Sequence, residues 1–241
     1  MNADALLEWF GDNVDFFETI TEDELNLVVP NCPGWTIVDL LNHLSFGLGV
    51  CYPIAAVAPP GTTADVVFVD ADRSTMDSEA TEARELFGTN MRSCLRELGS
   101  LNPVSPCWTY EGPGQVMFWL RRAAVETALH RFDAEVALGR PVTELSQDRA
   151  DEAIDETVDF ALPLACAKVG APPSKLQLNS TDTALVRSVG SGAESTTLAG
   201  SAQSLLLALW GRKPIDELEV DGDNDQAELW LTLVGRAFSG R

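Results

Sequence analysis

The stretch RRAAVETALHRFDAEVALGRP, residues 121–141, decides the class of fold that the sequence predicts. It contains no glycine or proline until its last three residues, GRP, and a glycine followed closely by a proline is typical of a helix end. We therefore expect one long helix from about Gln115 to Leu138. Because one helical turn separates Glu126 from His130, both side chains point to the same face of this helix.

The chain before this helix has a helical pattern too. Apolar residues recur at helical spacing near the start of the chain, which predicts one apolar stripe; they are Leu6, Phe10, Val14 and Phe17. A second helix is expected to begin near Thr36, because Pro33-Gly34 forms a turn and Thr36 with Asp39 has the pattern of a capping box. Residues 76–98 and 147–168 predict further helices, the last one bent near Pro163, and residues 53–75 predict a long crossing loop.

The sequence pattern changes after residues 170–173, GAPP. Short runs that contain threonine and valine follow, separated by turn residues, and predict small antiparallel strands at residues 175–181, 184–190 and 194–200. A helix at 201–212, a strand and turn at 218–223 and a last helix at 226–238 complete the chain. The predicted fold class is therefore α+β and mainly helical, with a helical bundle at residues 1–171 and a small α+β domain at residues 172–241.

The composition and net charge of the chain argue against two classes of binding partner. Among the 241 residues, 45% are hydrophobic and 22% are charged, as in ordinary globular proteins, but the net charge is -21. A polyanion of this size repels nucleic acid and anionic membranes, so we expect neither as a partner. Solubility, or adaptation to salt, accounts for this charge more simply than a functional acidic surface does.

The chain's first residues and its cysteines indicate a compartment. MNADALLEWF has no basic segment followed by an apolar run, and no apolar run of membrane-spanning length interrupts the rest. The five cysteines are scattered, odd in number and without a CxxC pair. This pattern favours reduced thiols in the cytoplasm over disulfides or a thiolate zinc site.

The chain has only two histidines, His43 and His130, and both lie among apolar neighbours. A buried imidazole or carboxylate needs a partner, and one metal ion would serve His43, Glu126 and His130 together. Three such ligands fit a catalytic zinc site with an open position, and they equally fit the facial triad of non-haem iron oxygenases. A solvated Glu–His pair on a helix surface is the simpler alternative, and spacing does not choose among these readings.

Three segments resemble the mycothiol-dependent maleylpyruvate isomerase family, in the family's order and over nearly the whole chain. They are NCPGWTIVDLLNHL (residues 31–44), RRAAVETALHRFDAEVALGRP (residues 121–141) and LLLALWGRKP with LEVDGD (residues 205–223). The resemblance implies a DinB-like, metal-binding four-helix bundle followed by a small C-terminal α+β domain. It also implies that His43, Glu126 and His130 are the metal ligands, with water or a thiol in the fourth position.

The resemblance assigns two further residues to the site. Arg212, in the LWGR motif, is expected to act in catalysis from the interdomain cleft, and Asp133 is expected to support a ligand or contact the thiol. Each has a structural alternative: Asp133 as a surface partner of Arg131 or Arg122, and Arg212 as a cation near a helix C-terminus. Outside these motif assignments, Trp35 is expected to be a packing anchor, and Cys32 a small buried apolar residue.

The implied activity uses a divalent metal, with zinc expected and nickel the alternative, and mycothiol as the thiol cosubstrate. A thiol made nucleophilic in this way would attack a small electrophile, either as an S-transferase or as a cis–trans isomerase, with maleylpyruvate isomerisation itself as one case. A non-catalytic small-molecule-binding or regulatory protein on the same fold is the alternative of another class, and an iron oxygenase is a third. We expect a monomer, and the sequence does not identify the electrophile.

Overall fold

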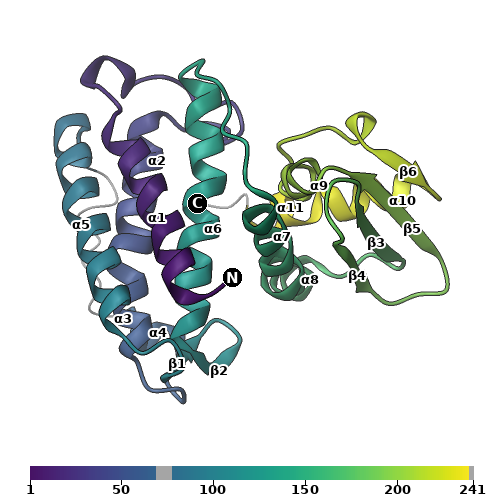
Figure 1. Cartoon of the computed structure of the whole chain (residues 1–241), viewed down its shortest axis with the longest axis horizontal. Helices are drawn as coiled ribbons and strands as arrows, with labels where there is room; N and C mark the ends of the chain where they lie inside the picture. Colours follow the sequence, from purple (N-terminus) through teal and green to yellow (C-terminus); the bar gives the residue numbers. More distant parts are fainter. Residues whose placement is uncertain (69–77, 239–241) are drawn as a thin grey trace. The chain divides into compact units, whose positions relative to one another are not determined.

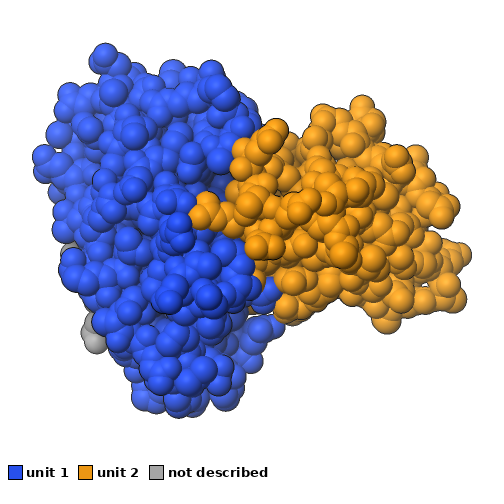
Figure 2. All heavy atoms as spheres, in the orientation of Figure 1, with its two compact units in different colours: residues 1–143 blue, residues 144–241 orange. Residues whose placement is uncertain are grey.

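The computed structural model covers the chain, and the structure describes residues 1–68 and 78–238. Two compact units make up the fold, residues 1–143 and residues 144–241 (Figure 2). The N-terminal unit is helical apart from a small hairpin, and the C-terminal unit combines helices with a four-stranded sheet (Figure 1). The prediction of a mainly helical α+β fold is confirmed.

Long helices form the core of the N-terminal unit. In this unit α1 packs against α5 and α6, and α2 packs against the same two helices. Their bounds, with those of the shorter elements, are α1 (Ala3–Glu18), η1 (Glu22–Glu24), α2 (Ile37–Leu44), η2 (Ser45–Val50), α3 (Cys51–Val57), α4 (Ala64–Val67), α5 (Ala80–Ser100), β1 (Pro106–Thr109), β2 (Gly112–Gln115) and α6 (Val116–Ala137).

Local sequence explains where these helices begin and which face they bury. The predicted stripe of α1 is buried, with Leu6, Phe10, Val14 and Phe17 each at most 1% exposed. Burial of such a stripe is the main source of stability for an amphipathic helix. The predicted capping box at α2 is present, because Thr36 N donates to Asp39 Oδ2 (2.8 Å) and Asp39 N donates to Thr36 Oγ1 (3.5 Å).

The crossing loop expected at residues 53–75 is wrong in two places, since Pro53 lies within α3 and α4 occupies Ala64–Val67. Proline is tolerated near a helix start, and here the π-helical segment η2 immediately precedes α3 and already interrupts the regular hydrogen-bond ladder. Burial of Tyr52 and Ala55 then holds α3 in the core. Residues 69–77, which include the rest of this loop and the first two residues of the helix predicted at 76–98, lie outside the described part.

The continuous helical stretch Ile37–Val57 is apolar on average, although Asp39, Asn42 and His43 interrupt its apolar residues. Among the described residues, this stretch is long and apolar enough by composition to cross a membrane, with a mean hydropathy of 1.4 in its best window. Of that window, 67% is buried inside the protein. The apolar residues of α2 and α3 therefore serve as core for the N-terminal unit.

The C-terminal unit places its sheet beside several helices. The sheet order is β4-β3-β5-β6, with β3 parallel to β5 and the other neighbours antiparallel. The elements are α7 (Gln147–Glu156), η4 (Thr157–Ala161), α8 (Leu162–Val169), β3 (Lys175–Ser180), β4 (Val186–Gly190), β5 (Ser195–Gly200), α9 (Ala202–Leu209), η5 (Ile215–Glu217), β6 (Glu219–Asp221), α10 (Asn224–Leu231) and α11 (Leu233–Phe238).

The predicted strands are present, but the expectation that all of them are antiparallel is wrong. The chain reverses after β3 and again after β4, so β5 runs in the direction of β3 and pairs with its other edge. Pairing there places Leu198 level with Leu178, and both side chains are fully buried. Adding β5 to the outer edge of the largely exposed β4 would not bury this apolar pair.

The division into compact units falls after Thr143, whereas the sequence suggested a boundary between residues 171 and 172. Helix α7 packs against α9, and α8 packs against α11. Because Ala150, Ala153 and Ile154 of α7 are buried in this way, the helix predicted at 147–168 belongs with the C-terminal sheet. Its predicted irregularity is the π-helical segment η4, which ends just before Pro163.

Candidate metal centre

Two helices of the N-terminal unit carry the predicted ligands. Glu126 and His130 lie one turn apart on α6, and His43 lies in the last turn of α2, which packs against α6. Glu126 is 9% exposed and His130 is 8% exposed. A carboxylate and an imidazole buried to this extent need polar partners, which the folded chain has to supply.

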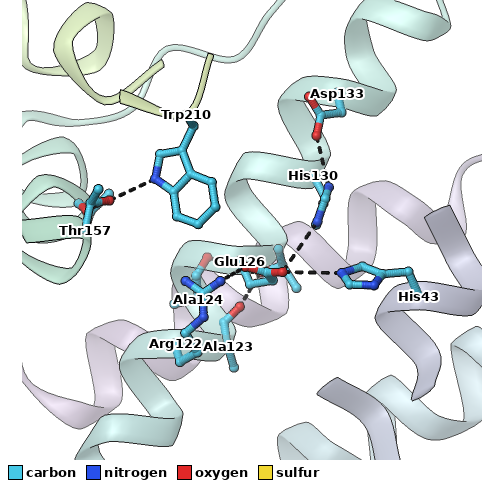
Figure 3. A network of polar contacts seen from close by, with 11 residues as sticks. His43, Arg122, Ala123, Ala124, Glu126, His130, Asp133, Thr157 and Trp210 are labelled. Atoms are coloured by element: carbon cyan, nitrogen blue, oxygen red, sulfur yellow. Dashed lines mark hydrogen bonds and ion pairs between the residues drawn. The ribbon is translucent and has the colours of Figure 1, made fainter. Parts of the chain in front are cut away.

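The structure brings the three side chains together around one oxygen atom (Figure 3). Glu126 Oε1 lies 3.3 Å from His43 Nε2 and 3.5 Å from His130 Nε2. One ligand atom from each residue lies within 4.8 Å of the other two. Two imidazole nitrogens and a carboxylate oxygen at this spacing fit a divalent ion such as zinc. The reading of Glu126 and His130 as a solvated surface pair is wrong, since both are buried.

Asp133 contacts the far side of the His130 ring. It has no solvent exposure, and its Oδ2 lies 2.9 Å from His130 Nδ1. A proton on Nδ1, donated to this carboxylate, leaves the Nε2 lone pair directed toward Glu126 and His43. The alternative in which Asp133 is a surface partner of Arg131 or Arg122 is wrong, because Asp133 is fully buried. Arg131 donates to Glu135, and Arg122 donates to Glu126.

Cys32 also contacts Asp133. Its thiol donates to Asp133 Oδ2 across 3.6 Å, and the side chain is half-buried. Cys32, His130 and Asp133 form a second group of three metal-binding atoms within 4.8 Å of one another, which shares His130 with the first. Cys32 is thus a hydrogen-bond donor beside the centre. The sequence predicted only a small buried apolar residue at this position.

Arg122 is the residue of this centre that the sequence did not single out. It is 7% exposed, lies one turn before Glu126 on α6, and its Nη2 donates to Glu126 Oε2 (Figure 3). The positions 122, 126 and 130 share one helix face, so spacing alone could have placed this guanidinium beside the carboxylate. Spacing gives the helix face of Arg122, but its burial depends on how α6 packs in the folded unit.

The surroundings keep His43 neutral. Burial lowers the pKa of His43 below its ordinary value of 6.5, and the positive charges that Arg122 carries and that His130 acquires on protonation lower it further. A neutral imidazole has a lone pair available for a metal ion at pH 7. Trp35 covers this part of the centre, with its ring centroid 5.0 Å from that of His43 and 6.2 Å from that of His130. The packing role expected for Trp35 therefore includes both imidazoles.

Two family models match this chain, and the two matched ranges overlap within α6. Residues 7–135 match the sequence model of the mycothiol maleylpyruvate isomerase N-terminal domain, and residues 119–229 match that of the MDMPI C-terminal domain. The chain belongs to the mycothiol maleylpyruvate isomerase family. His43, Glu126 and His130, the predicted ligands, and Asp133 lie within the first match. Among the curated proteins, none matches this chain.

Two solved structures share the fold of this family member. One is a mycothiol-dependent maleylpyruvate isomerase, with a TM-score of 0.66 and 13% sequence identity. The other is a histidine-to-alanine mutant of such an isomerase, with a TM-score of 0.65 and 13% identity. Each comparison covers 92% of this chain and 95% of the other chain. At this identity the likeness shows a common fold.

Arg212, the remaining predicted site residue, belongs to the C-terminal unit and lies within the second family match. It follows α9 directly, its Nη1 donates to Trp210 O (2.9 Å), and its guanidinium lies 5.8 Å from the centroid of the Trp210 ring. Trp210 in turn donates from Nε1 to Thr157 Oγ1 (2.9 Å; Figure 3). Arg212 thus has the position expected of a cation at a helix C-terminus, and its role in catalysis stays a prediction.

Proposed function

We propose that this protein is a metal-dependent enzyme that uses mycothiol, a low-molecular-weight thiol, to attack a small electrophilic substrate. The observation that carries the proposal is the convergence of His43, Glu126 and His130 from two helices. Membership of the family supports the choice of thiol, and the two solved structures of similar fold are named as mycothiol-dependent maleylpyruvate isomerases. Thiol-assisted cis–trans isomerisation is the reaction that these names favour, and S-transfer is the alternative at the same site.

The ligand set supports zinc as the ion, because nitrogen and oxygen donors without a redox task suit it, with nickel as the alternative. When bound, such an ion lowers the pKa of a coordinated thiol and so supplies a thiolate at neutral pH. His43 contributes a neutral imidazole, and Asp133 holds the ring of His130 through Nδ1. Trp35 packs against both rings, with centroid distances of 5.0 Å to His43 and 6.2 Å to His130.

For isomerisation, the protein then needs mainly to position the thiolate next to the double bond of the substrate. The thiolate of the cosubstrate adds to a conjugated cis double bond, the new single bond rotates, and elimination of the thiolate returns the trans isomer. In the transfer reaction the thiolate attacks an electrophilic carbon, the leaving group departs from that carbon with the electron pair of the broken bond, and the thioether remains. We propose Arg212 as a residue that contacts the substrate, in line with the family motif.

Metal analysis combined with an activity assay tests the proposal. We expect about one zinc or nickel ion per wild-type chain by mass spectrometry, and loss of both metal and activity in His130→Ala. Activity is followed as loss of the cis-diene absorbance of maleylpyruvate with and without mycothiol, and mass spectrometry of the products detects a retained thioether.

A variant of the same helix controls for damage to α6. Thr127 is buried next to Glu126, accepts a hydrogen bond from Asn13 Nδ2 (3.2 Å) and is no part of the ligand set. Thr127→Ala should keep its metal content while losing some stability. Full activity of His130→Ala, or a wild-type protein without stoichiometric metal, would contradict the proposal. Tight binding of a small ligand without turnover of any electrophile would favour a non-catalytic binding protein instead.

A further inference from the structure

The two oxygens of the Glu126 carboxylate have different partners. Oε1 faces the Nε2 atoms of His43 and His130, at 3.3 Å and 3.5 Å (Figure 3). Oε2 accepts a hydrogen bond from Nη2 of Arg122. Only one oxygen of this carboxylate is therefore directed at the space between the two imidazoles.

The contact between Arg122 and Glu126 is shielded from solvent. The side chain of Arg122 is 8% exposed and that of Glu126 is 12% exposed. A guanidinium stays protonated at any physiological pH, and a charge-assisted hydrogen bond is stronger where water does not compete. Arg122 can thus hold Oε2 firmly in its present direction.

The direction of Oε2 matters for the number of ligands. A carboxylate binds an ion through one oxygen or through both, and a catalytic zinc site has three protein ligands and one open position. If Oε2 turned toward the ion beside Oε1, it would take up the position that a thiol needs. Arg122 opposes that turn, because its hydrogen bond to Oε2 would have to break.

We propose that Arg122 is a positioning residue that restricts Glu126 to binding through Oε1 and so keeps one position of the metal centre open for the thiol. The inference rests on the proposed function, since it needs a metal at this site. It differs from a plain structural role, in which an Arg–Glu pair four residues apart stabilises the helix and has no effect on the metal.

Helix α6 contains a matched control pair. Arg131 donates from Nε to Glu135 Oε1 at 2.8 Å, again across four residues, and Glu135 also accepts from Thr143. This pair repeats the four-residue spacing of Arg122 and Glu126 on the same helix, with Nε as the donor atom in place of Nη2 and without a histidine at the carboxylate. Arg131→Met therefore removes an equivalent pair and leaves the metal centre intact.

Cobalt(II) is the probe for the experiment, because its visible absorption reports the coordination number. Metal-free wild type, Arg122→Met, Arg122→Lys and Arg131→Met are titrated with cobalt(II) against a competing chelator, and their spectra are recorded before and after addition of mycothiol. We expect Arg122→Met to bind cobalt(II) several-fold more tightly, because the freed Oε2 adds a donor oxygen and a positive charge next to the site is lost. Its absorption per ion should fall, as for a higher coordination number, and mycothiol should change its spectrum less.

The other two variants separate the effect of the charge at position 122 from the effect of losing an Arg–Glu pair on this helix. Arg122→Lys keeps the charge but offers a flexible ammonium in place of the planar fork, so we expect an intermediate affinity and spectrum. Arg131→Met should behave as wild type in both. If Arg122→Met does not fold, as judged by circular dichroism, Arg122→Lys decides the question, and a wild-type affinity and spectrum in that variant would overturn the inference.

Failure of this inference is distinguishable from failure of the proposed function. If wild type binds cobalt(II) and responds to mycothiol while Arg122→Met does the same with equal affinity and an equal spectrum, the inference is wrong and the metal centre stands. If wild type binds no cobalt(II) at His43, Glu126 and His130, with His130→Ala giving the same titration, both are wrong.

Discussion

Asp133 illustrates how much of the centre depends on single buried groups. Its carboxylate is fully buried, and it contacts both His130 Nδ1 and the thiol of Cys32. A buried carboxylate of this kind is stable only with such donors. Because the imidazole has two nitrogens, the residue that holds one of them decides which is left for a metal.

We predict that Asp133→Asn weakens zinc binding about 10- to 100-fold, because an amide is a poorer partner for the Nδ1 proton of His130. The measurement is a competition titration with a zinc chelator. Glu135→Gln is the control, since Glu135 is buried on the same helix but pairs with Arg131 and Thr143. Equal zinc affinities of wild type and Asp133→Asn would show that Asp133 does not orient the ligand.

For single residues, the predictions from sequence agree best with the structure where a motif identifies the residue. The two histidines and the spacing of Glu126 and His130 suggested the ligand set, the motif resemblance assigned it, and the fold places His43, Glu126 and His130 within reach of one ion. Arg122 and the hydrogen bond of Cys32 could not be predicted in the same way. The burial of Arg122 depends on how α6 packs, and the contact between Cys32 and Asp133 joins positions 101 residues apart.

Two helices define the centre, so the start of the shorter one affects its geometry. The eight-residue helix α2 carries His43 in its last turn, and its N-terminus is fixed by the capping box of Thr36 and Asp39. A short helix gains much of its stability from such caps and from packing. The correct orientation of His43 is therefore coupled to Thr36, seven positions earlier.

We predict that Thr36→Ala destabilises the N-terminal unit by about 1 kcal/mol, as loss of an N-cap side chain usually does. Urea unfolding of the metal-free protein measures this, and zinc affinity should fall by less than in His130→Ala because every ligand is still present. Thr62→Ala is the control, since the Thr62 hydroxyl donates to Pro59 O within a loop and caps none of the described helices. Thr36→Ala with the unfolding free energy of wild type would contradict the role of the cap.

Helical elements with a clear apolar stripe or cap, such as α1 and α2, were predictable, and elements that depend on distant contacts were not. Pro53 was taken as the start of a loop, yet the burial of α3 and the π-helical segment before it keep the chain helical. The parallel pairing of β3 with β5 depends on which edge buries Leu178 and Leu198, and local sequence carries no information on that choice. The same applies to the boundary after Thr143, which tertiary packing of α7 sets.

The charge of the whole molecule is a property that the sequence does give directly. Acidic residues number 37 and basic residues 16, for a net charge of -21. The basic side chains that are placed in ion pairs offset this only locally, for example where Arg187 pairs with Asp155 and Asp159, or Arg92 with Asp15 and Glu18. Self-repulsion of the remaining negative charge opposes the compact state.

We predict that sodium chloride raises the melting temperature of the metal-free protein, with most of the rise complete near 0.15 M, where charges are screened beyond roughly 8 Å. Screening weakens the repulsion among the many carboxylates more than it weakens the fewer, closer ion pairs. Choline chloride at equal ionic strength is the control, and an equal rise would assign the effect to screening and not to bound sodium. A melting temperature that falls or stays constant with salt would mean that the local ion pairs outweigh the net repulsion, and the acidic surface would then need an explanation other than solubility or adaptation to salt.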